Sequence, residues 1–423
     1  MTGAATDTGH TAPIGRVAPR VELVGVLAAS GVSILGSRVS ALAIPWLVLV
    51  TSGSPARMGL VAAAELVPYV VATALGGPVI DRLGTRRTAI VADLTSAVAM
   101  ACVVAFHDVG VGALLVLVAL AGGLRGFGDN AKRVLVLPIA TRADVPVVRV
   151  TAVFDGLNRL SLMLSASVAG LLIAWLGPAT TILVNVATFV VAGLLVAAVA
   201  STAPAGSAAP REPYLRAMRI AVEHLRCDRL IMHVVALLFV INVFNQAGSV
   251  VFIPLWAAEA LGSPVAFGAV LASVGLGLVL GNVVFTVLAT RLPRYATFTI
   301  GFLIGGAPRF LVLGLSDDLA TVLTVSFLAG CALASVNPII GVLIFERTPV
   351  PLHARVFGLV TAVAYAGLPV GGLLGGWAVT VVGLRPALIA TGVLYLAVAL
   401  LPVVRHRSWR QLDRVVSPED TPS

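Results

Sequence analysis

The sequence predicts an all-α membrane protein with about twelve transmembrane helices, arranged as two six-helix halves. Hydrophobic residues make up 59% of its 423 residues and charged residues only 11%, and its mean hydropathy is +1.04. Soluble domains are apolar for about half of their residues and charged for about a quarter. A soluble globular protein is therefore excluded. The net charge of +9 does not indicate nucleic-acid binding, because the basic residues occupy short breaks between apolar runs.

The apolar runs define the individual helices. A helix of about 20 residues crosses a bilayer, and runs of that length end here at charged residues or at Gly and Pro. The predicted spans are 22–50, 57–79, 88–107, 110–128, 151–175, 178–200, 230–255, 265–289, 295–315, 319–344, 355–382 and 384–404.

Polar segments divide the chain, and a weak internal repeat relates its two halves. The repeat begins with Arg-Val at Arg149 and again at Arg355, and each copy ends in a small-residue-rich helix. Parallel halves with a site between them are typical of alternating-access transporters. The predicted domains are a disordered cytoplasmic leader at 1–21, a bundle at 22–200, a linker with an amphipathic helix at 201–229, a bundle at 230–404 and a cytoplasmic tail at 405–423.

Basic residues collect after the even-numbered spans and in both terminal segments. Arg82, Arg86 and Arg87 follow the second span, and Lys132 and Arg133 follow the fourth. Cytoplasmic loops of membrane proteins carry an excess of Lys and Arg. Both termini of this multi-pass protein are therefore predicted to lie on the cytoplasmic side of the cell membrane.

The loop GGPVIDRLGTRR, at residues 76–87, holds four charges in seven positions. As a signal for membrane orientation its arginines would suffice, which leaves Asp81 and the glycines unexplained. An acid in a loop is able to accept hydrogen bonds from the free amides at a helix N-terminus. We therefore favour a conformational latch over a solvated turn.

This loop resembles the Gly-x-x-x-Asp-Arg-x-Gly-Arg-Arg/Lys signature that the major facilitator superfamily carries between its second and third helices. The matching residues are Gly77, Asp81, Arg82, Gly84 and Arg86, whereas Thr85 replaces a basic residue. The stretches SRVSALAIPWLVLVTSGSPARMGLVAAAELVPYVVATALGG and ARVFGLVTAVAYAGLPVGGLLGG resemble the drug-exporter branch of Tap-type and macrolide-efflux carriers.

The resemblance implies proton-driven export of amphipathic compounds. It also implies the partners of the latch: Asp81 would meet the start of helix eleven near Arg355, and Arg86 would reach Asp129 at the end of helix four. These bonds would form when the cavity faces outward and break when it faces inward.

We expect a secondary active transporter that exports amphipathic small molecules, such as drugs or natural products, by proton antiport with alternating access. The alternatives are a dedicated exporter of a single metabolite or siderophore, a facilitative or uptake carrier and, more remotely, a transporter-like receptor. The sequence contains no phosphate-binding loop, metal-ligand spacing or catalytic constellation. We therefore expect no enzyme activity, metal or cofactor, the proton gradient as energy source, and a monomer whose partners are a small-molecule substrate and the lipid bilayer.

Three ionisable residues are candidates for proton coupling, because a charge at membrane depth costs about 3 kcal/mol and marks a function or a partner. Glu65 lies roughly 12 Å inside the outer end of its span, and Arg38 lies at a similar depth. We favour Glu65 as the coupling acid over a static ion pair with Arg38. Asp93 is expected to anchor loop arginines. The acid that related exporters often carry in the first helix is Ser37 here.

Four polar residues and a further arginine are candidates for the substrate cavity. Three of them, Asn242, Asn245 and Gln246, share one face of helix seven. They either form hydrogen bonds with the substrate or form hydrogen bonds between helices that stabilise the bundle. Arg125 resembles, incompletely, a buried arginine of the superfamily, and it faces either the cavity or the inner leaflet. Tyr365 is the aromatic candidate.

Three other residues are expected to face lipid or the membrane surface. Arg309 lies in helix nine, which the resemblance makes peripheral, so we expect it to snorkel toward headgroups or to pack against neighbouring helices. Trp46 and Trp256 are expected in an interfacial aromatic belt. The arginines predicted at membrane depth, Arg38, Arg125 and Arg309, outnumber the single acid Glu65. This excess of positive charge predicts that the transporter tolerates neutral or anionic compounds.

Overall fold

The computed structural model describes residues 18–107, 110–200, 214–289, 291–349 and 352–413. In these ranges, twelve helices are long and apolar enough to cross a membrane, and the described residues form no strand. The predicted fold class is confirmed. Most of the predicted leader, the Ala- and Pro-rich start of the linker and the end of the tail lie outside the described residues.

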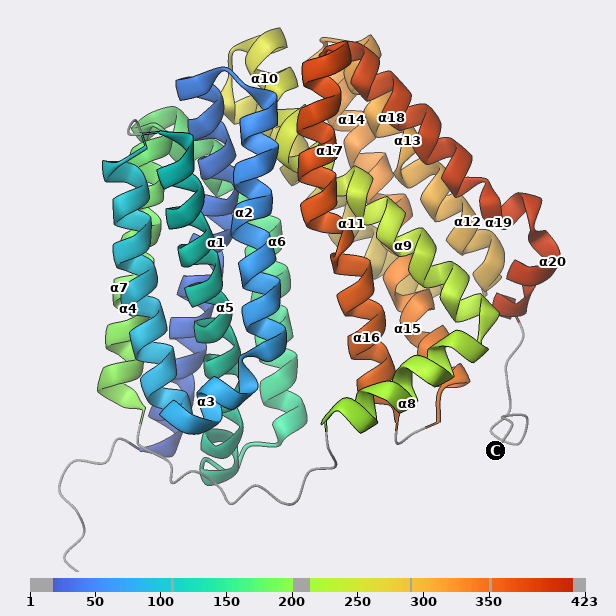
Figure 1. The fold of residues 1–423 in the computed structure, drawn as a ribbon. Coiled ribbons are helices and arrows are strands. Elements are labelled where there is room, and N and C mark those ends of the chain that lie inside the picture. The colour runs from blue at the N-terminus through green and yellow to red at the C-terminus, as the bar shows by residue number, and fades with distance from the viewer. Residues whose placement is uncertain (1–17, 108–109, 201–213, 290, 350–351, 414–423) are drawn as a thin grey trace, which may run out of the picture.

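Seven helices form the first bundle, which stands on the left of Figure 1. Six of them are predicted spans, and α3 is the short helix of the charged loop. They are α1 (Pro19–Ser52), α2 (Pro55–Leu75), α3 (Gly77–Leu83), α4 (Thr85–Ala105), α5 (Val111–Arg142), α6 (Val147–Leu176) and α7 (Pro178–Val199).

The second bundle is built from shorter segments, and α8 (Tyr214–Cys227) lies across its base in Figure 1. Five of its six spans consist of two or more consecutive helical segments. The segments are α9 (Arg229–Ala247), a π-helical turn (Gly248–Phe252), α10 (Ile253–Leu261), α11 (Pro264–Leu288), α12 (Arg294–Gly305), α13 (Ala307–Leu315), α14 (Leu319–Leu333), α15 (Val336–Arg347), α16 (His353–Tyr365), α17 (Gly367–Val382), α18 (Leu384–Ala399), α19 (Leu401–Val404), α20 (His406–Trp409) and a 3₁₀ turn (Arg410–Asp413).

Helix boundaries follow the local chemistry of the sequence. Asp228 caps α9 and Asp318 caps α14 by accepting hydrogen bonds from backbone amides. The hydroxyl and the amide of Thr321 both hydrogen-bond to Asp318 and lower the pKa of its carboxyl group. Gly177 and Gly383 have φ values of 80° and 86°, which glycine adopts without strain. They form the short turns that the sequence predicts between adjacent spans.

The fourth span differs most from its prediction. It was expected at 110–128, but α5 continues to Arg142 and carries Lys132 inside the bundle. The Nζ atom of Lys132 lies 2.8 Å from Oδ1 of Asp93, so the ion pair neutralises a charge that would otherwise end the span. Lys132 is therefore not a loop residue, and its use as a sign of membrane orientation was wrong.

The two bundles touch through glycines in their upper parts in Figure 1, where α2 meets α17 and α6 meets α11. A Cβ atom on Gly59 would contact the carbonyl of Gly372. A Cβ on Gly170 would approach Cα of Gly268 to 2.9 Å. Small residues of this kind let helix backbones pack closely in a membrane. We call this set the glycine seam: Gly59, Gly170, Gly268 and Gly372.

Two tryptophans expected at the membrane surface lie inside the protein instead. Trp46 of α1 stacks on Phe267 of α11, with 5.6 Å between ring centroids, and thereby also joins the bundles. The indole N–H of Trp256 donates to the carbonyl of Ser316 at 3.2 Å. Both side chains are buried, because each makes these contacts inside the protein. The prediction of an interfacial aromatic belt was therefore wrong for these two residues.

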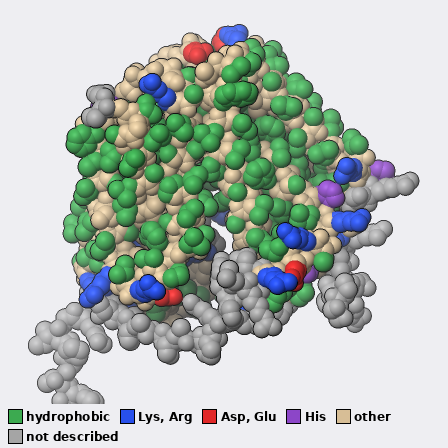
Figure 2. All heavy atoms as spheres, viewed as in Figure 1, with side chains coloured by type: hydrophobic (Ala, Val, Ile, Leu, Met, Phe, Trp, Pro, Cys, Tyr) green, Lys and Arg blue, Asp and Glu red, His purple; other side chains and the backbone are tan. Residues whose placement is uncertain are grey.

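Away from the seam the bundles diverge toward the end that carries α3 and α8, which we call the basic end (Figure 1). Figure 2 shows a hollow between the bundles there, and several Lys and Arg side chains gather around it. Contact at one end and separation at the other leave an opening that leads into the centre of the protein.

The seam predicts a stability difference between glycine variants. We expect Gly59→Ala to lower the free energy of unfolding by about 1–3 kcal/mol, because the facing atom is a backbone carbonyl that has no other rotamer. Thermal unfolding of the purified protein measures this effect. Gly112→Ala, with no atom within 4 Å of the added Cβ, is the matched control and should be neutral or slightly stabilising. Equal melting temperatures for the two variants would contradict a tight seam.

Candidate functional site

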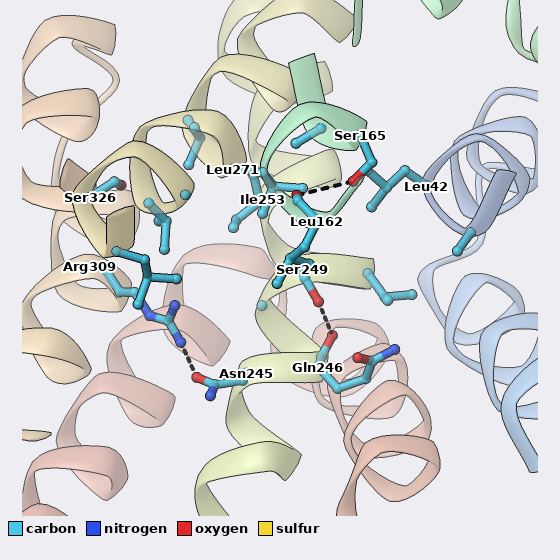
Figure 3. Close-up of a pocket in the computed structure, with 18 of the residues that line it drawn as sticks. Leu42, Leu162, Ser165, Asn245, Gln246, Ser249, Ile253, Leu271, Arg309 and Ser326 are labelled. Atoms are coloured by element: carbon cyan, nitrogen blue, oxygen red, sulfur yellow. Dashed lines mark hydrogen bonds between the residues drawn. The ribbon is translucent and has the colours of Figure 1, made fainter. Parts of the chain in front are cut away.

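A cavity of about 330 Å³ lies between the two bundles. One wall comes from α1 and α6, and the other comes from α9, the π-helical turn, α10, α11, α13 and α14 (Figure 3). Apolar side chains make most of the surface, with a few polar groups among them. The apolar lining includes Leu42, Leu162, Ile253, Val270, Leu271 and Val274. Such a mixture binds small molecules by area and shape and orients them through a few polar contacts.

Two of the predicted cavity residues reach this space from the end of α9. Asn245 and Gln246 both line the cavity, and the hydroxyl of Ser249 donates to the backbone carbonyl of Gln246 at 3.3 Å (Figure 3). The π-helical turn begins just beyond these residues, at Gly248. Single π turns are frequent at functional sites of helical proteins.

Arg309 also lines the cavity, which corrects the expectation that it snorkels toward headgroups. The alternative of packing against a neighbouring helix agrees with its contact to α9. One of its terminal nitrogens donates a hydrogen bond to Oδ1 of Asn245 (Figure 3). Its guanidinium carbon lies 4.8 Å from the centre of the Phe310 ring. The segment α13 begins after a break at Gly306, where a Cβ would overlap the ring of Tyr395. Close packing of α13 on α18 thus turns Arg309 inward, toward α9.

The other two polar candidates of the second bundle do not belong to the cavity lining. The side-chain amide of Asn242 donates to the carbonyl of Ala364 at 3.0 Å and ties α9 to α16. Tyr365 is 52% exposed at the end of α16. For Asn242, the interhelical alternative is therefore the one that the structure favours.

In the first bundle, Glu65 pairs with Arg125 and not with Arg38. An arginine terminal nitrogen lies 2.6 Å from Oε1 of Glu65, and the guanidinium of Arg125 stacks over Tyr69 at 4.4 Å. The helices are close enough because Gly122 of α5 packs on the backbone of Glu65. Arg38 lines the cavity instead. The alternative of a static Glu65–Arg38 pair was wrong, since α5 lies nearer than α1 to this face of α2.

Asp93 and Lys132 form a second buried ion pair. Lys132 Nζ lies 2.8 Å and 3.1 Å from the two carboxylate oxygens of Asp93, and it donates to the hydroxyl of Ser33 at 2.8 Å. Asp129 Oδ1 lies 3.6 Å away. Asp93 therefore binds a lysine from within the membrane span, where the sequence predicted loop arginines. The apolar run VLVLPIA after Lys132 and Arg133 was the signal that the helix continues.

The charged loop forms the helix α3, which packs on α2, α4 and α5 of its own bundle. A nitrogen of Arg86 donates to the carbonyl of Ala197 at 2.7 Å. Arg86 therefore contacts the end of α7 in this conformation, and its contact with Asp129, which is expected when the cavity faces outward, stays a prediction. Gly84 has φ of 82° at the turn into α4, which explains its place in the motif. Asp81 and Arg82 are exposed at the basic end.

Within the described ranges, no group of three or more His, Cys, Asp or Glu residues is placed to hold a metal ion.

The model of the Major Facilitator Superfamily matches residues 26–245 and 235–419. The multidrug efflux pump Tap of Mycobacterium tuberculosis is 29% identical over 402 residues, 92% of this chain and 94% of Tap. Tap of Mycolicibacterium fortuitum is 27% identical over 395 residues, 90% of this chain and 95% of that protein.

Solved structures share the fold. The nucleoside transporter NupG superimposes with a TM-score of 0.74 at 12% identity, covering 90% of this chain and 98% of NupG. An inward-facing, occupied bacterial homologue of the human lysosomal transporter Spinster gives a TM-score of 0.68 at 14% identity, with coverage of 97% and 100%.

The ion pair between Lys132 and Asp93 predicts a large effect of one substitution and its repair by a second. We expect Lys132→Met to destabilise the protein by about 3–5 kcal/mol, because Asp93 would lose its buried partner. Lys132→Met combined with Asp93→Leu removes both charges and should recover most of the loss. Thermal unfolding measures both variants.

The control for this prediction is an exposed ion pair. Arg385 lies 2.5 Å from Asp317 with both side chains about half exposed, and Arg385→Gln should cost no more than about 1 kcal/mol. A double variant as unstable as Lys132→Met alone would refute the stabilising role of the pair.

Proposed function

The chain belongs to the major facilitator superfamily, and on that premise we propose that it exports amphipathic small molecules, such as drugs or natural products, across the cytoplasmic membrane. We propose proton antiport as the driving reaction and alternating access as the mechanism. Substrate would bind in the cavity between the bundles, and the two bundles would pivot to expose it to one side or the other.

The observation that carries this proposal is the largely apolar cavity between the bundles. Its residues come from both halves of the chain, so relative motion of the halves changes which side the cavity opens to. The Tap relatives, which cover nine-tenths of the chain, support drug-like compounds as substrates. An apolar cavity binds through surface area, which suits varied amphipathic ligands.

The orientation in the membrane follows from the positive-inside rule. The basic end would face the cytoplasm, with both termini on that side. The hollow in Figure 2 opens toward this end, so we propose that the structure represents an inward-facing state ready to take up substrate from the cytoplasm. Closing the basic end and separating the glycine seam would then release substrate outside.

We propose the pair of Glu65 and Arg125 as the site of proton coupling. Each side chain is only 12–15% exposed, so loss of the negative charge on Glu65 would leave a positive charge unpaired within the bundle. Such a charge is costly in a low-dielectric environment and would favour a rearrangement of α2 and α5. In this mechanism proton binding changes the relative stability of two conformations.

The proton-coupling proposal predicts the behaviour of Glu65→Gln in proteoliposomes. Wild-type protein should transport a fluorescent amphipathic drug into vesicles severalfold faster when the lumen is acidic than when the pH values are equal. Glu65→Gln should abolish this dependence on the gradient while keeping a hydrogen-bond acceptor for Arg125. Flux of the dye under both conditions provides the measurement.

Glu259→Gln, at an exposed acid in α10, is the control and should retain the response to the gradient. Each alternative function has its own outcome. Absence of any ligand movement would favour a receptor, gradient-independent flux of wild-type protein would favour a facilitative carrier, and rejection of all but one compound would favour a dedicated exporter. An unchanged response in Glu65→Gln would refute coupling through this acid.

The latch proposal predicts that Asp81→Asn impairs transport while leaving membrane insertion intact. In the proposed outward-facing state, Asp81 accepts hydrogen bonds from the second bundle and holds the basic end closed. Transport rate and the amount of folded protein in the membrane are the two quantities to measure. Asp144→Asn removes another exposed acid at the same end and should be silent, since Asn also tolerates its positive φ of 54°. Normal flux in Asp81→Asn would contradict the latch and favour the interpretation of the loop as a solvated turn.

A further inference from the structure

Arg309 lies within the membrane span of the second bundle without an acidic partner. Every carboxylate described in this bundle and at its junction with α8 lies at or beyond a span end: Asp228, Glu259, Asp317, Asp318, Glu346 and Asp413. Three of them pair with arginines at their own end, at 2.9, 2.5 and 2.7 Å. Asp318 caps α14 and Asp413 accepts from the amide of Tyr295.

The hydrogen-bonding groups around Arg309 leave most of its donors unused. A guanidinium carries five N–H donors, and one donates to Asn245. Its Nε atom is buried and has no hydrogen-bond partner among the described residues. The buried hydroxyl of Tyr395 is also without one. A buried donor without a partner costs free energy, which an acceptor supplied by a ligand would recover.

A second arginine reaches the cavity from the opposite bundle. Arg38 of α1 is part of the lining, and its buried Nε atom also lacks a hydrogen-bond partner within the described chain. The lining residues include no Asp or Glu. Two carboxylates of the first bundle lie nearby: Glu65 pairs with Arg125 at 2.6 Å. Asp129 lies 3.6 Å from Lys132 and is also close enough to attract Arg38, whereas Arg309 has no acidic partner among the described residues.

We propose that the cavity binds amphipathic anions, with a carboxylate, sulfonate or similar group held by Arg309 and Arg38 and an apolar body against the leucine and valine side chains. The anion would supply the counter-charge that Arg309 lacks within its own bundle. An arginine binds such groups through two parallel hydrogen bonds. A cationic ligand would meet two positive charges in the cavity lining, and the lining holds no Asp or Glu to offset them.

This inference rests on the proposed function for the transport of such anions, but the binding preference is testable without transport. Two probes share one apolar body and differ by one charged group: 1-anilinonaphthalene-8-sulfonate is an anion and N-phenyl-1-naphthylamine is neutral. Ethidium adds a permanent cation. Their dissociation constants are measured on the full chain in nanodiscs of neutral lipid, with the signal of empty nanodiscs subtracted.

We expect wild-type protein to bind the sulfonate about tenfold more tightly than its neutral counterpart, since charge-assisted hydrogen bonds of this kind readily supply a tenfold factor. Arg309→Gln and Arg38→Gln should each reduce this preference severalfold while leaving the affinity for the neutral probe unchanged. Retained binding of the neutral probe also shows that the variant is folded. Arg309→Lys, which keeps the charge, should retain most of the preference, and Arg385→Gln at the exposed surface should retain all of it.

Three outcomes would overturn the proposal: equal wild-type affinities for the two naphthylamines, tighter binding of ethidium than of the sulfonate, or an unchanged preference in both Gln variants. If Arg309→Gln binds neither probe, the other two variants test the proposal. Arg309→Lys should then retain most of the preference for the sulfonate, and Arg38→Gln should lose much of it. Vesicle flux separates this inference from the proposed function. Anion preference without flux would uphold the site and refute export, whereas equal flux of all three probes would uphold export and refute the site.

Discussion

The low dielectric of the membrane makes an unpaired charge within it costly, and the rest of this structure depends on that constraint. Lys132 joins α5 to α4 and α1 through Asp93 and Ser33, and Arg125 joins α5 to α2 through Glu65. The first bundle is therefore held together by ion pairs around one central helix. The second bundle has no such pair at membrane depth among its described residues, and Arg309 faces a cavity instead. The same cost underlies the proposal that an anion binds beside Arg309.

The cavity exists because the bundles meet closely at one end and diverge toward the other. Backbone contacts at Gly59 and Gly372 and the stacking of Trp46 on Phe267 bring α2 to α17 and α1 to α11. Beyond these contacts, side chains from both bundles face a shared space. A ligand bound there would touch both halves at once, which is the geometric requirement for coupling its binding to their relative motion.

Apolar runs interrupted by charged residues and by Gly and Pro predicted the twelve spans, because polar residues are costly in a bilayer. The spacing of Asn245 and Gln246 predicted that the two side chains share one helical face, and both line the cavity between the bundles. The rotation of each helix and the identity of its neighbours were not predictable in the same way. Glu65 and Arg38 lie at similar predicted depths in the membrane, which made them plausible partners. Because α5 packs closely on α2, Glu65 pairs with Arg125 instead. The partner of Lys132 lies 39 residues away in α4, and the inward turn of Arg309 depends on Tyr395 in α18.

The glycine seam also bears on the entropy of opening and closing. A long side chain that is immobilised at an interface loses up to about 2 kcal/mol of rotamer freedom, whereas glycine loses none. Contacts such as that of Gly59 with Gly372 therefore form and separate without freezing or releasing side chains. The free-energy difference between joined and parted bundles is then set by shape and by desolvation at the seam. Such an interface is able to close tightly and still separate with little change in side-chain conformational entropy.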